Sequence, residues 1–136
     1  MQKLFIQSTK TSPEVLLSPT ENIFHIKGNS MPEDVRAIYY PVTDWIRTFV
    51  GDLLIDSSAY TLVNPLVFKL DLVYFNSSSA KFLFDIFTEL KRLRKSGIPF
   101  RIEWYYEHED QEMKDAGLDM SSMSEIEFTL IEKSEE

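Results

Sequence analysis

The 136-residue chain contains no cysteine and only two histidines. Without cysteine it cannot form disulfide bonds, thiolate metal sites or a thiol nucleophile. It also lacks an apolar run of about 18 residues, the length that a membrane-spanning helix needs, and its first residues lack the apolar core of a signal peptide. These absences predict a cytoplasmic protein that does not insert into membranes.

The chain also has fewer positively charged than negatively charged residues. The 14 Lys and Arg residues stand against 22 Asp and Glu residues, so the formal net charge is −8 at pH 7. A surface field of this sign repels phosphate backbones, and nucleic acid is therefore not expected as a partner. The length and the hydrophobic fraction of 43% predict one globular domain over residues 1–136, with a short charged tail from about residue 132.

Apolar residues recur along the chain with the periods of strands and helices. We expect strands near residues 3–7, 23–26, 66–75, 98–104 and 126–130, helices near 32–51 and 80–95, and a short helix between the last two strands. Ser, Thr and Pro are frequent in residues 9–20, which are expected to form a loop, and Gly28 to Ser30 are expected to form a turn. Pro41 is expected to kink or split the first helix.

The alternation of strand, helix and strand implies parallel crossover connections. We therefore expect an α/β fold, a single small sandwich whose mixed, partly parallel sheet is covered by helices. The strand at 66–75 is the most apolar, which predicts a central position with its far end buried on both faces. Trp45 and Trp104 fall on periodic apolar faces and are expected in the core.

Catalytic motifs are missing from the sequence. It has no glycine-rich phosphate loop, no G-x-S-x-G elbow and no spacing of metal ligands around His25 or His108, which are expected to be structural or solvated. The acidic residues of 107–119 lack the spacing of an EF-hand and are expected to be a solvated segment. No catalytic residue, cofactor or metal is predicted, and a small ligand-binding or metal-binding domain remains the alternative.

Polar hydroxyls gather where the apolar strand passes into the second helix, in Asn76, Ser77, Ser78 and Ser79. Ser and Asn are good helix N-caps and need no further role. A helix N-terminus also favours an added phosphate, whose oxygens accept the free N–H groups. The residues alone leave both interpretations open.

Four motifs carry a resemblance to known families. The hydroxyl cluster at a helix start resembles that of anti-sigma-factor antagonist (STAS) domains. More closely, the chain is similar to the SiaC family of bacterial regulatory phosphoproteins. The matching motifs occur in the same order as in that family and span nearly the whole chain. The matching motifs are Gly28-Asn29-Ser30-Met31-Pro32-Glu33-Asp34, Trp45-Ile46, Tyr74-Phe75-Asn76-Ser77-Ser78-Ser79 and Trp104-Tyr105-Tyr106-Glu107.

This resemblance implies a STAS-like fold and a non-enzymatic signalling switch in cyclic di-GMP and biofilm control. The family is phosphorylated by a dedicated kinase, dephosphorylated by a PP2C-type phosphatase, and binds a diguanylate cyclase when unphosphorylated. Its phosphoacceptor, usually Thr, falls on Ser77, with Ser78 and Ser79 as alternatives. Asp34 stands where the family usually has Asn.

The same resemblance implies a partner-binding surface around the phosphoacceptor. Its expected residues are Asn76, Ser30, Glu33, Tyr106 and Glu107. A constitutive scaffold that never carries phosphate would share the fold, and the sequence does not give the oligomeric state.

Overall fold

The computed structural model describes residues 1–134 of the chain. It contains one mixed sheet, three α-helices and a short 3₁₀ helix, η1. The elements in chain order are β1 (Leu4–Ile6), β2 (Glu14–Ser18), β3 (Ile23–Ser30), α1 (Val35–Ile55), β4 (Leu66–Phe75), α2 (Ser77–Lys91), η1 (Arg92–Ser96), β5 (Phe100–Glu107), α3 (Gln111–Ser124) and β6 (Thr129–Lys133).

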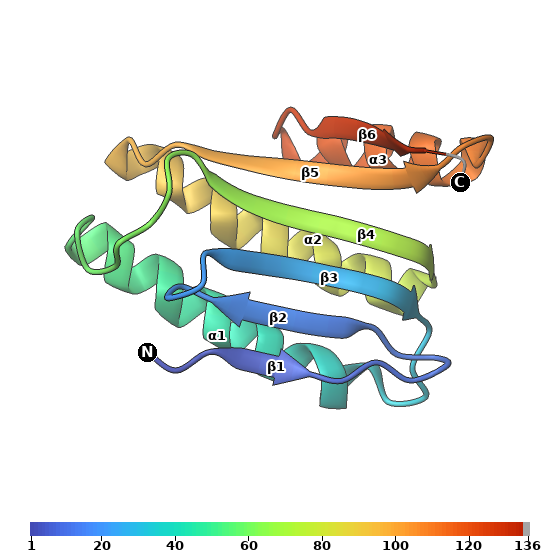
Figure 1. Ribbon diagram of the computed structural model, residues 1–136, viewed down its shortest axis with the longest axis horizontal. Coiled ribbons are helices and arrows are strands. Elements are labelled where there is room, and N and C mark those ends of the chain that lie inside the picture. The colour runs from blue at the N-terminus through green and yellow to red at the C-terminus, as the bar shows by residue number, and fades with distance from the viewer. Residues whose placement is uncertain (135–136) are drawn as a thin grey trace.

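The strands lie in the sheet in the same order as in the sequence. β1, β2 and β3 are antiparallel neighbours, whereas β3, β4, β5 and β6 run parallel to one another. Each parallel connection carries one α-helix, and because successive crossovers in this order share a hand, the three helices lie behind one face of the sheet (Figure 1). The expected α/β fold with a mixed sheet is confirmed, as a two-layer structure whose second sheet face is uncovered.

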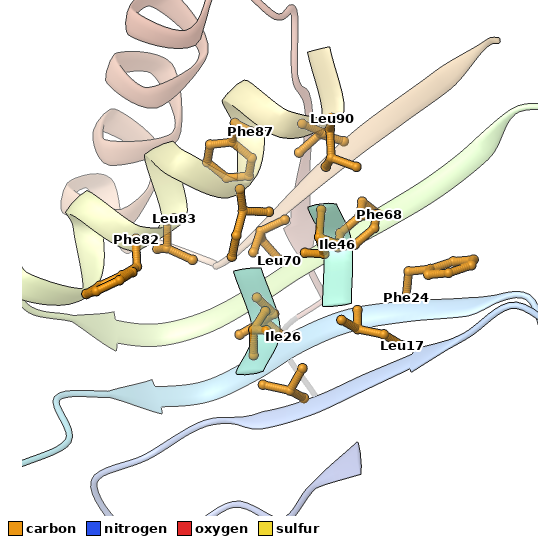
Figure 2. Close-up of a cluster of buried hydrophobic side chains, with 14 of the residues drawn as sticks. Leu17, Phe24, Ile26, Ile46, Phe68, Leu70, Phe82, Leu83, Phe87 and Leu90 are labelled. Atoms are coloured by element: carbon orange, nitrogen blue, oxygen red, sulfur yellow. The ribbon is translucent and has the colours of Figure 1, made fainter. Parts of the chain in front are cut away.

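The core lies between this sheet and helices α1 and α2. The inward positions of β4 are Leu66, Phe68, Leu70 and Leu72, each at most 4% exposed. Figure 2 shows Phe68 and Leu70 among buried side chains of β3, α1 and α2. The alternate positions of β4 face the uncovered side, where Asp71 accepts a hydrogen bond from Lys133 of β6 at 2.9 Å. Trp45 and Trp104 are buried, as predicted.

The prediction that residues 9–20 form a loop is wrong, because they contain β2. Val15 and Leu17 point into the core and are fully buried, and β2 pairs with β1 on one side and β3 on the other. The prediction of a turn at Gly28 to Ser30 is also wrong. These residues end β3, where the register against β4 shifts between Gly28 and Asn29, and Gly28 has the positive φ of 105° that glycine tolerates.

Helix α1 differs from its prediction at both ends. It begins at Val35 rather than near Pro32, because Asp34 is its N-cap and accepts a hydrogen bond from the Ala37 N–H at 3.2 Å. It runs past Gly51 to Ile55 without a break at Pro41. Burial of one apolar face over the whole length, down to Leu53, stabilises the helix across the proline.

The far end of β4 is not buried on both faces, since Val73 and Tyr74 are 55% and 50% exposed. Pairing with β5 stops at Leu70 and Trp104, and within residues 1–134 no helix covers the second face (Figure 1). The segment before β6 is a helix of 14 residues, α3. Glu132 and Lys133 belong to β6, so the expected tail starts later, and its last two residues lie outside the described part. No helix of residues 1–134 is long and apolar enough to cross a membrane.

Candidate functional site

The strands β3, β4 and β5 all end at one edge of the sheet, where the chain continues toward α1, α2 and α3 (Figure 1). Functional groups of open α/β sheets gather beyond the carboxyl ends of the parallel strands. The structure brings every predicted site residue to this edge, on three successive connections. Ser30 and Glu33 follow or end β3, Asn76, Ser77, Ser78 and Ser79 follow β4, and Tyr106 and Glu107 end β5.

Asn76 is the residue that caps α2. Its side-chain Oδ1 accepts a hydrogen bond from the Ser79 N–H at 2.9 Å, and its own backbone N–H donates to the Ser30 carbonyl at 3.0 Å. The cap therefore joins the start of α2 to the end of β3. Ser77 is left as the first residue of the helix.

Ser77 and Ser78 lie exposed on the first turn of α2. Throughout residues 1–134 neither hydroxyl has a hydrogen-bond partner. The backbone N–H groups of a first helical turn have no intrahelical acceptor, and the helix dipole places partial positive charge there. Either side chain can receive a phosphoryl group without breaking a contact of the fold.

Ser79 differs from its two neighbours because it is fully buried. Its hydroxyl donates to the Ser30 carbonyl at 2.9 Å and accepts from the Ser30 hydroxyl at 2.9 Å. A modifying enzyme cannot reach this oxygen while α2 is docked. The structure thus separates the three serines into two accessible hydroxyls and one that holds the fold together.

Tyr39 completes this buried group, and sequence reasoning missed it. Its hydroxyl lies 2.6 Å from the Ser30 hydroxyl. Since the single proton of Ser30 goes to Ser79, Tyr39 is the donor of this bond. Burial raises the pKa of Tyr39 to about 12, so the phenol keeps the proton it donates. The three hydroxyls come from β3, α1 and α2 and fix the start of α2 against both neighbours.

The remaining predicted partner residues share the edge, and in residues 1–134 no hydrogen bond or ion pair joins them to Ser77. Glu33 is exposed in the connection from β3 to α1. Tyr106 is half-buried, with the Lys114 ammonium 5.8 Å from the centre of its ring. Glu107 is exposed and pairs with Lys133 at 3.2 Å. These contacts leave the outer surface of the edge open, with acidic groups on it.

Neither histidine is placed as part of a metal site. His25 bonds to the Glu14 carboxylate at 2.8 Å on the uncovered sheet face, and this bond holds the pKa of Glu14 below its ordinary value. His108 lies 3.6 Å from a carboxylate oxygen of Glu132. Over the described range, no group of three or more His, Asp or Glu side chains is arranged to hold a metal ion.

Comparison with known proteins matches this architecture to one family. The family model described as "SiaC family regulatory phosphoprotein" matches residues 6–133. A protein of Pseudomonas aeruginosa strain UCBPP-PA14 is 27% identical over 111 residues, which is 82% of this chain and 81% of that protein.

Solved structures of SiaC from Pseudomonas aeruginosa have the same fold. Apo-SiaC has a TM-score of 0.77 at 23% identity, covering 98% of this chain and 100% of that one. SiaC in a complex with the diguanylate cyclase SiaD, which it activates, has a TM-score of 0.82 at 23% identity, covering 96% and 99% of the two chains. The family resemblance read from the four sequence motifs is confirmed: the chain belongs to the SiaC family of regulatory phosphoproteins.

Proposed function

We propose that this chain is a non-enzymatic switch in the cytoplasm that binds a diguanylate cyclase and is controlled by phosphorylation of Ser77. The observation that carries the proposal is an accessible serine hydroxyl on the first turn of α2, in a member of a regulatory phosphoprotein family. A dedicated kinase and a PP2C-type phosphatase would add and remove the phosphate, as the family resemblance implies.

Burial supports Ser77 or Ser78 over Ser79 as the acceptor. Ser79 is fully buried and uses its hydroxyl in two hydrogen bonds, whereas both neighbours are exposed. Between the two accessible residues, the position of the family's phosphoacceptor favours Ser77. Serine in place of the usual threonine keeps the hydroxyl that accepts the phosphoryl group.

The effect of the phosphate would be electrostatic and steric. It adds about −1.5 to −2 charges at an edge that already carries Glu33, Asp34, Glu107 and Asp110, on a chain with a net charge of −8. A partner seated on this edge would meet both the added bulk and the added field, which weakens association. The diguanylate cyclase is the proposed partner because a SiaC protein of the same fold forms a complex with such an enzyme.

Phosphosite mapping of the protein isolated from its own cells tests the switch. Trypsin releases the peptide from Leu70 to Lys81, whose hydroxyl groups are those of Tyr74, Ser77, Ser78 and Ser79. We expect phosphate on Ser77. Its absence from all three serines under several growth conditions would favour the constitutive scaffold.

A matched pair of variants separates the two accessible serines. On a phosphate-affinity gel we expect Ser77→Ala to remove the retarded band and Ser78→Ala to keep it. Ser77→Ala should also retain a diguanylate cyclase through affinity purification under conditions in which the wild-type protein is phosphorylated and releases it. A melting temperature raised by Mg²⁺ or another metal would instead support the ligand-binding alternative.

A further inference from the structure

Lys81 lies one helical turn after Ser77 on α2, and its ammonium pairs with a carboxylate one turn further on. Its Nζ is 3.1 Å from Oδ2 of Asp85, and the two side chains are 71% and 44% exposed. At this spacing an ion pair is stronger when the acid precedes the base, because that order suits the helix dipole. The Lys81 pair with Asp85 has the weaker order.

A phosphate on Ser77 would form an ion pair with Lys81 in which the acid precedes the base, which is the stronger arrangement. Residues 77 and 81 lie on one face of the helix at the same spacing, the acid would come first, and phosphate carries more charge than a carboxylate. Helical side chains also lean toward the N-terminus, which is the direction of Ser77. We propose that Lys81 is the counter-ion of a phosphate on Ser77 and that it leaves Asp85 to take this role. The inference rests on the proposed function only in assuming that Ser77 carries the phosphate.

Through this exchange of partners by Lys81, phosphorylation of Ser77 would also change a second surface of the protein. A groove of about 300 Å³ between α1 and α2 is lined by residues that include Tyr40, Arg47, Lys81, Phe82 and Asp85. The Lys81 ammonium now lies 4.8 Å from the centre of the Phe82 ring. When Lys81 turns toward the phosphate, the Phe82 ring loses its cation, and Asp44, Arg47 and Asp85 remain as the charged residues that line the groove. Arg47 also contacts Asp44 and Glu89, at 3.3 and 3.4 Å.

The test uses phosphoserine installed at position 77 during translation, which needs no kinase. The ³¹P NMR titration midpoint of this protein, near pH 6, is compared with those of Lys81→Gln and Lys95→Gln. We expect Lys81→Gln to raise the midpoint by about 0.3 pH unit, the size that an exposed helical pair supports. Lys95, at the other end of the segment in η1, is the control and should not shift it. An unchanged midpoint in Lys81→Gln would overturn the proposal.

Asp85→Asn tests whether Lys81 is shared between the two acids. Asp85→Asn frees Lys81 from its ion pair, so the lysine can pair more fully with the phosphate. The variant should therefore lower the phosphate midpoint more when Lys81 is present than in the Lys81→Gln background, where there is no lysine to free. Equal shifts in both backgrounds would refute the exchange. Both results are independent of whether cells phosphorylate Ser77, so a failure here is distinguishable from a failure of the proposed function.

Discussion

Gly117 of α3 lies directly against the indole ring of Trp104 in β5. A Cβ atom added to Gly117 would stand 2.5 Å from Cδ1 and 2.7 Å from Nε1 of the tryptophan. The indole N–H donates to the Met113 carbonyl, one turn earlier in α3, at 3.0 Å. These contacts dock an acidic, weakly apolar helix onto the sheet edge that carries the candidate site.

Gly117→Ala should therefore destabilise the protein, although alanine is the better helix former by about 1 kcal/mol. Trp104 is 1% exposed and hydrogen-bonded, so its ring cannot move aside, and overpacking a core costs about 1–3 kcal/mol. Gly51→Ala in α1 is the matched control, because nothing lies within 4 Å of its added Cβ. In urea unfolding we expect Gly51→Ala to raise the midpoint and Gly117→Ala to lower it. A rise in both variants would contradict this account.

Tyr39→Phe should lower the free energy of unfolding by about 1 kcal/mol. The substitution keeps the buried ring, which stacks on Phe82, but removes the proton that Tyr39 donates to Ser30. Tyr40→Phe removes a hydroxyl of the next residue that is half-exposed and unbonded in residues 1–134. Its stability should stay within about 0.5 kcal/mol of wild type. Equal losses in the two variants would show that the buried hydrogen bond contributes nothing.

The sequence predicts those elements of the fold that local pattern determines. The strand at 66–75 has the predicted bounds, and a helix follows it as predicted, because long apolar periods lie within one segment. This helix begins at Ser77 rather than near residue 80 and ends at Lys91, with η1 over residues 92–96. The sequence did not predict β2, because its alternating apolar pattern is limited to Val15 and Leu17, in a stretch with the composition of a loop. Its pairing partners on both sides, and not its own pattern, make it a strand.

In the candidate site, too, some features follow from local sequence pattern and others only from contacts between distant residues. A run of hydroxyls at a helix start identifies the serines, but not which of them is accessible. That distinction comes from hydrogen bonds between Ser30, Tyr39 and Ser79, which are up to 49 positions apart in the chain. No local period encodes such contacts. Tyr39 could have been suspected only as a polar tip on the apolar face of α1.

Acid should weaken the fold partly through Glu14. Its hydrogen bond with His25, with a further contribution from Lys27, holds the folded-state pKa below the ordinary value of 4.5. A depressed carboxyl pKa stabilises the fold above pH 4.5, and this stabilisation is lost as the pH falls through the folded-state value. Between pH 6 and 3 we therefore expect Glu14→Gln to lose less stability than wild type. Glu33→Gln, at an exposed carboxylate without an ion pair in the described chain, should follow the wild-type curve.

An added anion should be tolerated at Ser77 and not at Ser79. Ser77→Asp places a carboxylate on the exposed first residue of α2, where the helix dipole favours negative charge by about 0.3–1 kcal/mol. Ser79→Asp would bury an unpaired charge beside the Ser30 carbonyl, at a loss of about 3 kcal/mol or more. Thermal unfolding should give a melting temperature at or above wild type for Ser77→Asp and a large fall for Ser79→Asp. Similar melting temperatures would mean that the buried hydroxyl group of Ser79 does not hold α2 in place, and Ser79 would then be as open to phosphorylation as the two exposed serines.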